Sequence, residues 1–258
     1  MYIGGDMMIV RETISSFHMT AQHDHALMSE EIARHFSEDL FLSNDYREEA
    51  YIAIREHDRA WICLDQTPIW NDQMHVPYSF MDYPLSPKLV MYTKGIDEVE
   101  MIDQYAGLLC SIHFSSFVDI RDSRQQECIQ FIEHERNRQE RLNKQLNYPN
   151  KEVVNRYFQL LQLADAFSLY ICLNEPGATK SDEYPWFVDG FNPRINGKKF
   201  VAEWKNQSEI KITPYPFADE FFITYQTKYV SKSLREKKGI DFAYHHTNFT
   251  NSMIKFVR

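Results

Sequence analysis

The chain has 258 residues, of which 43% are hydrophobic and 14% aromatic, so it can bury a substantial core and is not disordered throughout. The formal net charge of −9 argues against binding to a nucleic acid duplex or an anionic membrane, because both depend on an excess of Lys and Arg. Eight glycines, none spaced as in a dinucleotide fingerprint or a P-loop, disfavour a Rossmann domain and a P-loop ATPase.

Targeting signals and cysteine spacing suggest where the protein works. The first 20 residues lack a basic start followed by an apolar run, and no apolar stretch approaches the roughly 20 residues that span a bilayer. The four cysteines are widely scattered, without a Cys-x-x-Cys pair, as is typical of reduced thiols. We therefore expect a cytoplasmic protein of bacterial type.

The N-terminal part of the chain reads mainly as helix. A short strand is expected over 7–13, which contains MMIVRE, and the proline-containing segment 64–88 reads as irregular. The last expected helix ends at the stop signal Asn-Glu-Pro-Gly, 174–177. Apolar positions three and four residues apart predict five helices, over 20–36, 45–61, 97–118, 122–147 and 151–173.

After residue 177 the pattern changes to strands rich in β-branched and aromatic residues, expected over 198–204, 208–213, 220–230 and part of 241–257. The predicted fold class is therefore mainly α, a bundle of about five or more helices with a small C-terminal β region. We expect a helical core over 14–177 and a β-rich elaboration over 178–258, packed with strand 7–13 as one compact unit.

Four of the expected helices carry His or Asp side chains within their apolar stripes. They are His25, the adjacent pair His57 and Asp58, His113, and Asp165 in LLQLADAFSLYIC. A single buried His is typical of an ordinary hydrogen-bonded core residue. A lone ionised Asp in an apolar stripe is costly unless it is paired or metal-bound.

The convergence of these five residues favours a metal site. Imidazole and carboxylate are usual ligands of divalent first-row metals, and facing helices of a bundle commonly build such sites. We expect one or two divalent ions, of Mn, Fe, Ni, Co, Mg or Zn. His23 is the alternative to His25 as the first ligand, but its helical neighbours form a more polar face.

These residues resemble a known family pattern. A His on one helix, a His-Asp pair on a second and a distant Asp on a last helix form the signature of the HD superfamily of metal-dependent phosphohydrolases. The match is His25, then His57-Asp58 in EHDRAW, then Asp165 in LADAFSLY. The N-terminal two thirds, including QHDHA and YAGLLCSIHFSSF, resembles a bacterial family of HD-like proteins of unknown function.

The resemblance implies an HD-like helical core and a set of ligands. His25, His57, Asp58 and Asp165 would hold the metal, and His113 matches the extra histidines of bimetallic HD proteins. Asp58 and His57 would also be catalytic, with Asp58 helping to orient a water molecule. The implied activity is hydrolysis of a phosphate ester or nucleotide by a metal-dependent phosphohydrolase.

Other interpretations stay open. A degenerate HD fold can serve as a non-catalytic ligand-binding or sensor protein, and a related HD subgroup consists of di-iron oxygenases. A nucleophilic Cys110 beside His113 is a further alternative. The expected partner is a small phosphate-containing molecule, for which Arg55 and Arg59 are candidate contacts. The segment 61–83 can form a pocket rim or a packed loop, and a homo-oligomer is compatible with the sequence.

Overall fold

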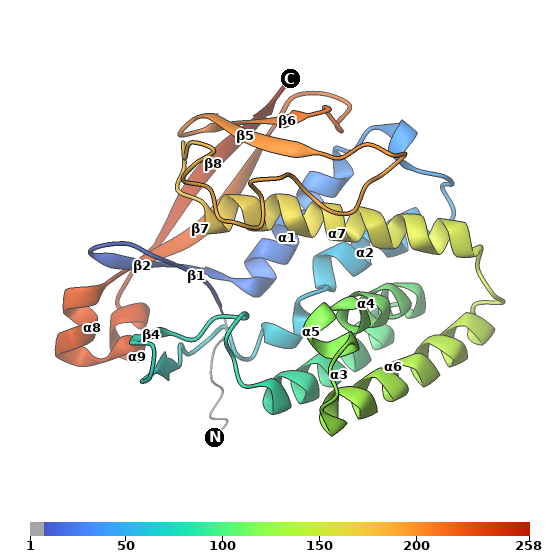
Figure 1. Cartoon of the computed structure of the whole chain (residues 1–258), viewed down its shortest axis with the longest axis horizontal. Helices are drawn as coiled ribbons and strands as arrows, with labels where there is room; N and C mark the ends of the chain where they lie inside the picture. Colours follow the sequence, from blue (N-terminus) through green and yellow to red (C-terminus); the bar gives the residue numbers. More distant parts are fainter. Residues whose placement is uncertain (1–7) are drawn as a thin grey trace.

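The computed structural model describes residues 8–258, so Met7 of the expected strand 7–13 lies outside the described residues. A helical layer packs against a curled sheet of six strands (Figure 1). Helices make up 48% of the structure and strands 21%. The predicted fold class, mainly α with an all-α bundle and a small β region, is therefore wrong: the sheet is a principal layer of the molecule.

The main helices come largely from the first two thirds of the chain. Figure 1 shows α7 across the middle, between the strands and the helices α3, α4 and α6. Among residues 8–258, no helix combines the length and apolar character that crossing a membrane requires. The helices are α1 (Gln22–Arg34), α2 (Arg47–Glu56), α3 (Leu85–Ile102), α4 (Gln104–Ser116), α5 (Val118–Arg121), α6 (Gln126–Gln145), α7 (Lys151–Leu173), α8 (Lys232–Lys238) and α9 (Ile240–His245), with short 3-10 turns at Glu38–Leu40 and Arg59–Trp61.

The six-stranded sheet joins both ends of the chain. Its order is β1-β2-β7-β8-β6-β5, with β6 and β8 parallel and all other pairs antiparallel. Strand β2 therefore brings the segment before α1 into the same sheet as the C-terminal strands. The strands are β1 (Met8–Glu12), β2 (Ser16–Ala21), β5 (Val201–Asn206), β6 (Glu209–Thr213), β7 (Phe221–Ser231) and β8 (Phe249–Val257); β3 (Trp70–Asn71) and β4 (Val76–Pro77) form a separate hairpin.

Strand β7, which corresponds to the strand expected over 220–230, is the link through which the N-terminal strands join the C-terminal ones in a larger sheet than expected. Along Phe221–Val230 buried and exposed residues largely alternate, so one face of the strand packs on the helices. It pairs with β2 on one side and with β8 on the other. The short segment SFHMTA of β2 is missed because its few alternating residues precede a helix without a break.

The region expected as one helix over 97–118 contains two. Helix α3 begins twelve residues earlier than predicted, because Pro84 precedes its first turn and Pro87 lies within that turn, where the missing N–H has no intrahelical partner to lose. The break lies at Asp103, whose side chain accepts the N–H of Ala106 and starts α4. Similarly, helix α9 occupies the start of the tail expected as strand.

Helix α3 approaches the turn after His57-Asp58 very closely at Gly95. A Cβ at this position would lie 2.6 Å from Cα of Ala60. We expect Gly95→Ala to lower the free energy of unfolding by about 1–3 kcal/mol through overpacking, despite the helix propensity of Ala. Thermal melting would measure this. The exposed neighbour Lys94→Ala, on the same helix, should change it by less than about 0.5 kcal/mol. An unchanged or higher melting temperature for Gly95→Ala would show that this close approach does not limit packing.

Candidate metal centre

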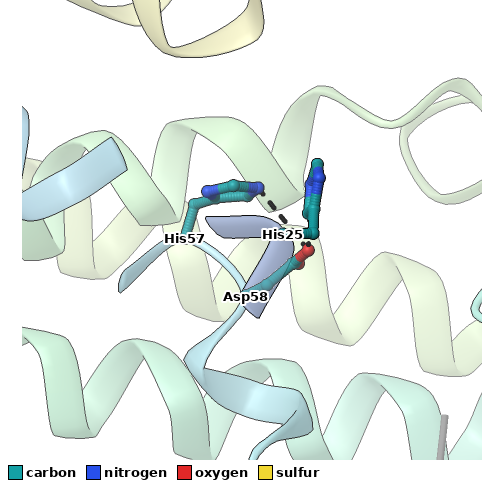
Figure 2. Close-up of side chains that lie close together, drawn as sticks. All are labelled: His25, His57 and Asp58. Carbon is teal, nitrogen blue, oxygen red and sulfur yellow. Dashed lines mark ion pairs between the residues drawn. The ribbon is translucent and has the colours of Figure 1, made fainter. Parts of the chain in front are cut away.

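The five predicted ligands converge between α1, α2, α4 and α7. His25 comes from α1, His57 and Asp58 follow α2, His113 comes from α4, and Asp165 comes from α7. The potential ligand atoms form two groups, and within each group all the atoms lie within 4.8 Å of one another. The first group is His25, His57 and Asp58, and the second is His57, His113 and Asp165. Figure 2 shows the side chains of His25 and His57 directed at the carboxylate of Asp58.

His25 is completely buried, and its ring orientation is fixed by hydroxyl groups. Its Nδ1 lies 2.6 Å from Oγ of Ser168, whose hydroxyl donates to the carbonyl of Asp165 at 2.9 Å. Ser168 thus holds the Nδ1 side of the ring, and the Nε2 of His25 points to the opposite side. That Nε2 lies 3.0 Å from Oδ1 of Asp165 and 3.7 Å from Oδ2 of Asp58.

His57 is held in one tautomer by the backbone. Its Nδ1 lies 2.7 Å from the carbonyl oxygen of Ile54, an acceptor only, so Nδ1–H is the donor. Its Nε2 lies 3.5 Å from Asp58 and 3.6 Å from Asp165, and it has no hydrogen-bond partner within the described chain. A carbonyl behind Nδ1 is the usual arrangement that orients a metal-ligating His.

The two rings thus direct their Nε2 atoms at two carboxylates. Lone pairs and carboxylate oxygens repel one another unless a cation or a proton lies between them. The donor set of imidazole nitrogens and carboxylate oxygens, together with the unpaired Nε2 of His57, fits a divalent metal ion. A proton shared with these carboxylates is the alternative in the metal-free protein.

The pKa values of the cluster are set by burial on one side and by the neighbouring histidines and carboxylates on the other. Burial lowers the pKa of His57, but the carboxylates of Asp58 and Asp165 outweigh burial and raise it to about 9. Burial alone raises the pKa of Asp165, but the neighbouring His25 and His57 bring it well below its usual range. For Asp58 burial prevails and raises the pKa. In the metal-free protein, His57 therefore carries a proton at neutral pH that a metal must displace.

His113 extends the cluster on the side of α4. It is buried, its ring centroid lies 5.3 Å from that of His57, and its Nδ1 has no hydrogen-bond partner among the described residues. Burial lowers its pKa to about 3, so the ring is neutral and able to act as a ligand. His113 belongs to the second group of potential ligands, which has His57 in common with the first group.

Three other predicted residues lie elsewhere. His23 is outside the cluster, and its backbone N–H donates to Asp65. Arg55 forms an ion pair with Glu56, and Arg59 pairs with Glu56 and Glu98. Neither arginine lines the cavity over the metal centre, so the geometry does not place them against a ligand.

The Cys110 alternative is not supported by the geometry. Its thiol is completely buried and lies 3.6 Å from the carbonyl of Ala53, toward α2. Burial raises the pKa of this thiol far above its usual value, whereas a nucleophilic Cys needs a lowered one.

A cavity of about 390 Å³ opens over the cluster. All five predicted ligands line it. Three further lining residues are polar or charged, Gln22, Lys88 and Asp119, of which Gln22 and Asp119 were not predicted; Gln22 is one turn before His25. The others are mainly aromatic: Trp61, Phe80, Tyr92, Phe117 and Trp186.

The segment 61–83 forms part of this cavity wall, through Trp61, Phe80 and Met81. Trp186, from the loop after α7, meets Phe80 edge to face with ring centroids 6.2 Å apart. The 61–83 segment and the loop therefore meet at the cavity. The sequence signal for this part of the cavity wall was the concentration of aromatic residues in the otherwise irregular segment 61–83.

No curated protein and no solved structure matches this chain. A family model matches residues 8–232, which include every proposed ligand. The model does not name the HD superfamily, so that resemblance stays a prediction. The match covers most of the chain, and the chain therefore belongs to the DUF3891 family, described as a protein of unknown function.

Proposed function

We propose that this protein is a metal-dependent hydrolase of a phosphate ester. The observation that carries the proposal is the pair of Nε2 atoms, of His25 and His57, directed at the carboxylates of Asp58 and Asp165 in the wall of a cavity. Ligand pockets of this size, with a few convergent polar groups and shifted pKa values, are characteristic of active sites.

The ligand set narrows the choice of metal. His25, His57 and His113 provide nitrogen donors alongside two carboxylates. Imidazole suits Zn, Fe, Ni and Co better than Mg, which prefers oxygen ligands and retained water. When bound, such an ion supplies Lewis acidity: it polarises a phosphoryl oxygen and makes a water molecule more acidic.

The chain's own residues supply the rest of the chemistry. Asp58 lies at the edge of the cluster with 11% of its side chain exposed, where one carboxylate oxygen can orient water in the cavity. His25 and His57 stay fixed through the groups behind their Nδ1 atoms. The apolar wall excludes water around the ester.

Metal content and turnover together test the proposal. The purified protein, loaded separately with Mn, Fe, Co, Ni and Zn, is assayed against a panel of phosphate monoesters and diesters. We expect turnover, and at least a 100-fold lower rate for Asp58→Asn and for His57→Ala. His246→Ala serves as the control, because this exposed residue at the end of α9 is far from the cluster in sequence and outside the cavity. Full metal loading without turnover on the panel would contradict the proposal and favour a ligand sensor.

The number of potential ligands, three histidines and two aspartates, also supports a second candidate, a di-iron oxygenase. That activity needs two irons per chain and a position open to O₂. An ultraviolet-visible spectrum after anaerobic iron loading and exposure to O₂ separates the two candidates: a hydrolase shows no oxygen-dependent change linked to substrate.

A further inference from the structure

Lys88 is a buried cation that the hydrolytic chemistry leaves unexplained. It lies in the first turn of α3, only 6% exposed, and it lines the cavity. Its Nζ donates one hydrogen bond, to the carbonyl of Phe80 at 2.8 Å, although an ammonium has three donors. Within the described chain, no carboxylate lies within 4.0 Å of it. A buried charge with no carboxylate in direct contact is costly, which points to an anionic ligand.

Lys88 lies away from the metal centre. The carboxylates that act on it are Asp119 and Asp82, whereas those of the metal centre are Asp58 and Asp165. The buried Tyr92 lines the same cavity as Lys88 and the metal centre. Because Asp119 is exposed, water screens its charge, and it neutralises the buried charge of Lys88 only in part.

The cavity wall near Lys88 is apolar and aromatic. Trp61 and Tyr92 meet edge to face with centroids 5.1 Å apart, and Phe117 packs against Tyr92 in the same way at 6.1 Å. At the rim, Trp186 is 52% exposed. Aromatic rings arranged in this way favour a planar ring as the middle part of a ligand.

The cavity also has few cations. Lys88 is the only Lys or Arg among its described lining residues, since Arg55 and Arg59 lie outside it. A di- or triphosphate chain carries three or four negative charges and is normally held by several cations or a glycine-rich loop. The site therefore suits one phosphoryl group at the metal and one further anionic group.

We propose that the substrate is an aryl phosphate monoester with a second, carboxylate-type anionic group, which Lys88 binds across the aromatic part of the cavity. This inference rests on the proposed function for the identity of the reacting group. It concerns the recognition of the ligand, and it can be tested by binding alone.

Two non-hydrolysable ligands provide the test. Phenylphosphonate and 4-carboxyphenylphosphonate are titrated into the metal-loaded protein by isothermal calorimetry, with the 3-carboxy isomer as a second geometry. Wild type should bind one carboxylated ligand about tenfold more tightly than phenylphosphonate, the gain typical of a charged hydrogen bond. Lys88→Met should reduce this ratio to about one and leave phenylphosphonate affinity unchanged. Lys94→Met, an exposed lysine on the same helix outside the cavity, should keep the wild-type ratio.

The outcomes separate this inference from the proposed function. A wild-type ratio of one or less for both isomers, or an unchanged ratio in Lys88→Met, would overturn it. Equal loss of both ligands in a Lys88→Met protein that melts like wild type would also overturn it, by showing that Lys88 shapes the cavity instead. If the phosphonates bind as expected but phenyl phosphate and its carboxylated forms are not hydrolysed, the proposed hydrolase activity fails and the ligand class stands.

Discussion

Asp165→Asn should abolish tight metal binding. Asp165 is the carboxylate that lies nearest to His25 and it belongs to the second group of potential ligands with His57 and His113. The amide of the introduced Asn is nearly isosteric with the carboxylate, but it carries no charge and is a poor ligand for a divalent metal. Since mutations of groups behind the ligands already cost 10–100-fold in affinity, loss of a ligand should cost more than about 100-fold. Elemental analysis of the purified variant and calorimetric titration with Zn and Mn would measure this.

Asp119→Asn is the matched control. It removes the same charge from the same cavity, but Asp119 is exposed and lies outside both groups of potential ligands. Its metal content and affinity should stay within about threefold of wild type. Circular dichroism of both variants checks that they are folded. If Asp165→Asn keeps its metal, or if wild type binds none of the metals tightly, the centre is an ion-pair network within the core.

The sequence was sufficient to predict the cluster of potential ligands because its signal is local to each helix. His25, His57, His113 and Asp165 each interrupt an apolar stripe, and an unpaired polar group there requires a partner from another stripe. The choice of His25 over His23 follows from helical periodicity alone, and the structure brings His25 into the cluster. The predicted strands 198–204, 208–213 and 220–230 also correspond to β5, β6 and β7.

The remaining features depend on contacts between distant segments. The pairing of β2 with β7 joins residues more than 200 positions apart, and no local pattern records it. The cavity wall has the same origin, because Phe80 and Trp186 meet there from two irregular segments. Arg55 and Arg59 were chosen for their closeness in sequence to His57-Asp58. Helix geometry instead turns them toward Glu56 and Glu98.

The metal-free and metal-loaded proteins should differ in how their stability depends on pH. In the metal-free protein the pKa of His57 is about 9, above the value near 6.5 of the unfolded chain. A group whose pKa is raised on folding stabilises the protein fully below the unfolded pKa, and this contribution is lost as pH rises through the folded pKa. Between pH 6.5 and 9 the metal-free protein should therefore lose about 3 kcal/mol of unfolding free energy.

The loaded protein should show no such loss, because a bound metal requires His57 to be deprotonated already. As pH rises over the same window, apparent metal affinity increases up to about tenfold per pH unit, which offsets the declining stability of the metal-free form. Below pH 6.5 it is the loaded protein whose unfolding free energy falls with decreasing pH, because His57 becomes protonated in the unfolded chain but not in the loaded one. In the metal-free protein His57 is then protonated in both states and makes no pH-dependent contribution.

Urea denaturation at half-unit pH steps, with a chelator or with saturating Zn, measures both curves. His246→Ala should reproduce the wild-type pair of curves, because His246 is exposed on α9. His57→Gln should flatten the metal-free curve between pH 6.5 and 9 and remove the stabilisation by Zn. Parallel curves for the metal-free and loaded wild type would mean that metal and proton do not compete at His57, which would exclude this histidine as a ligand.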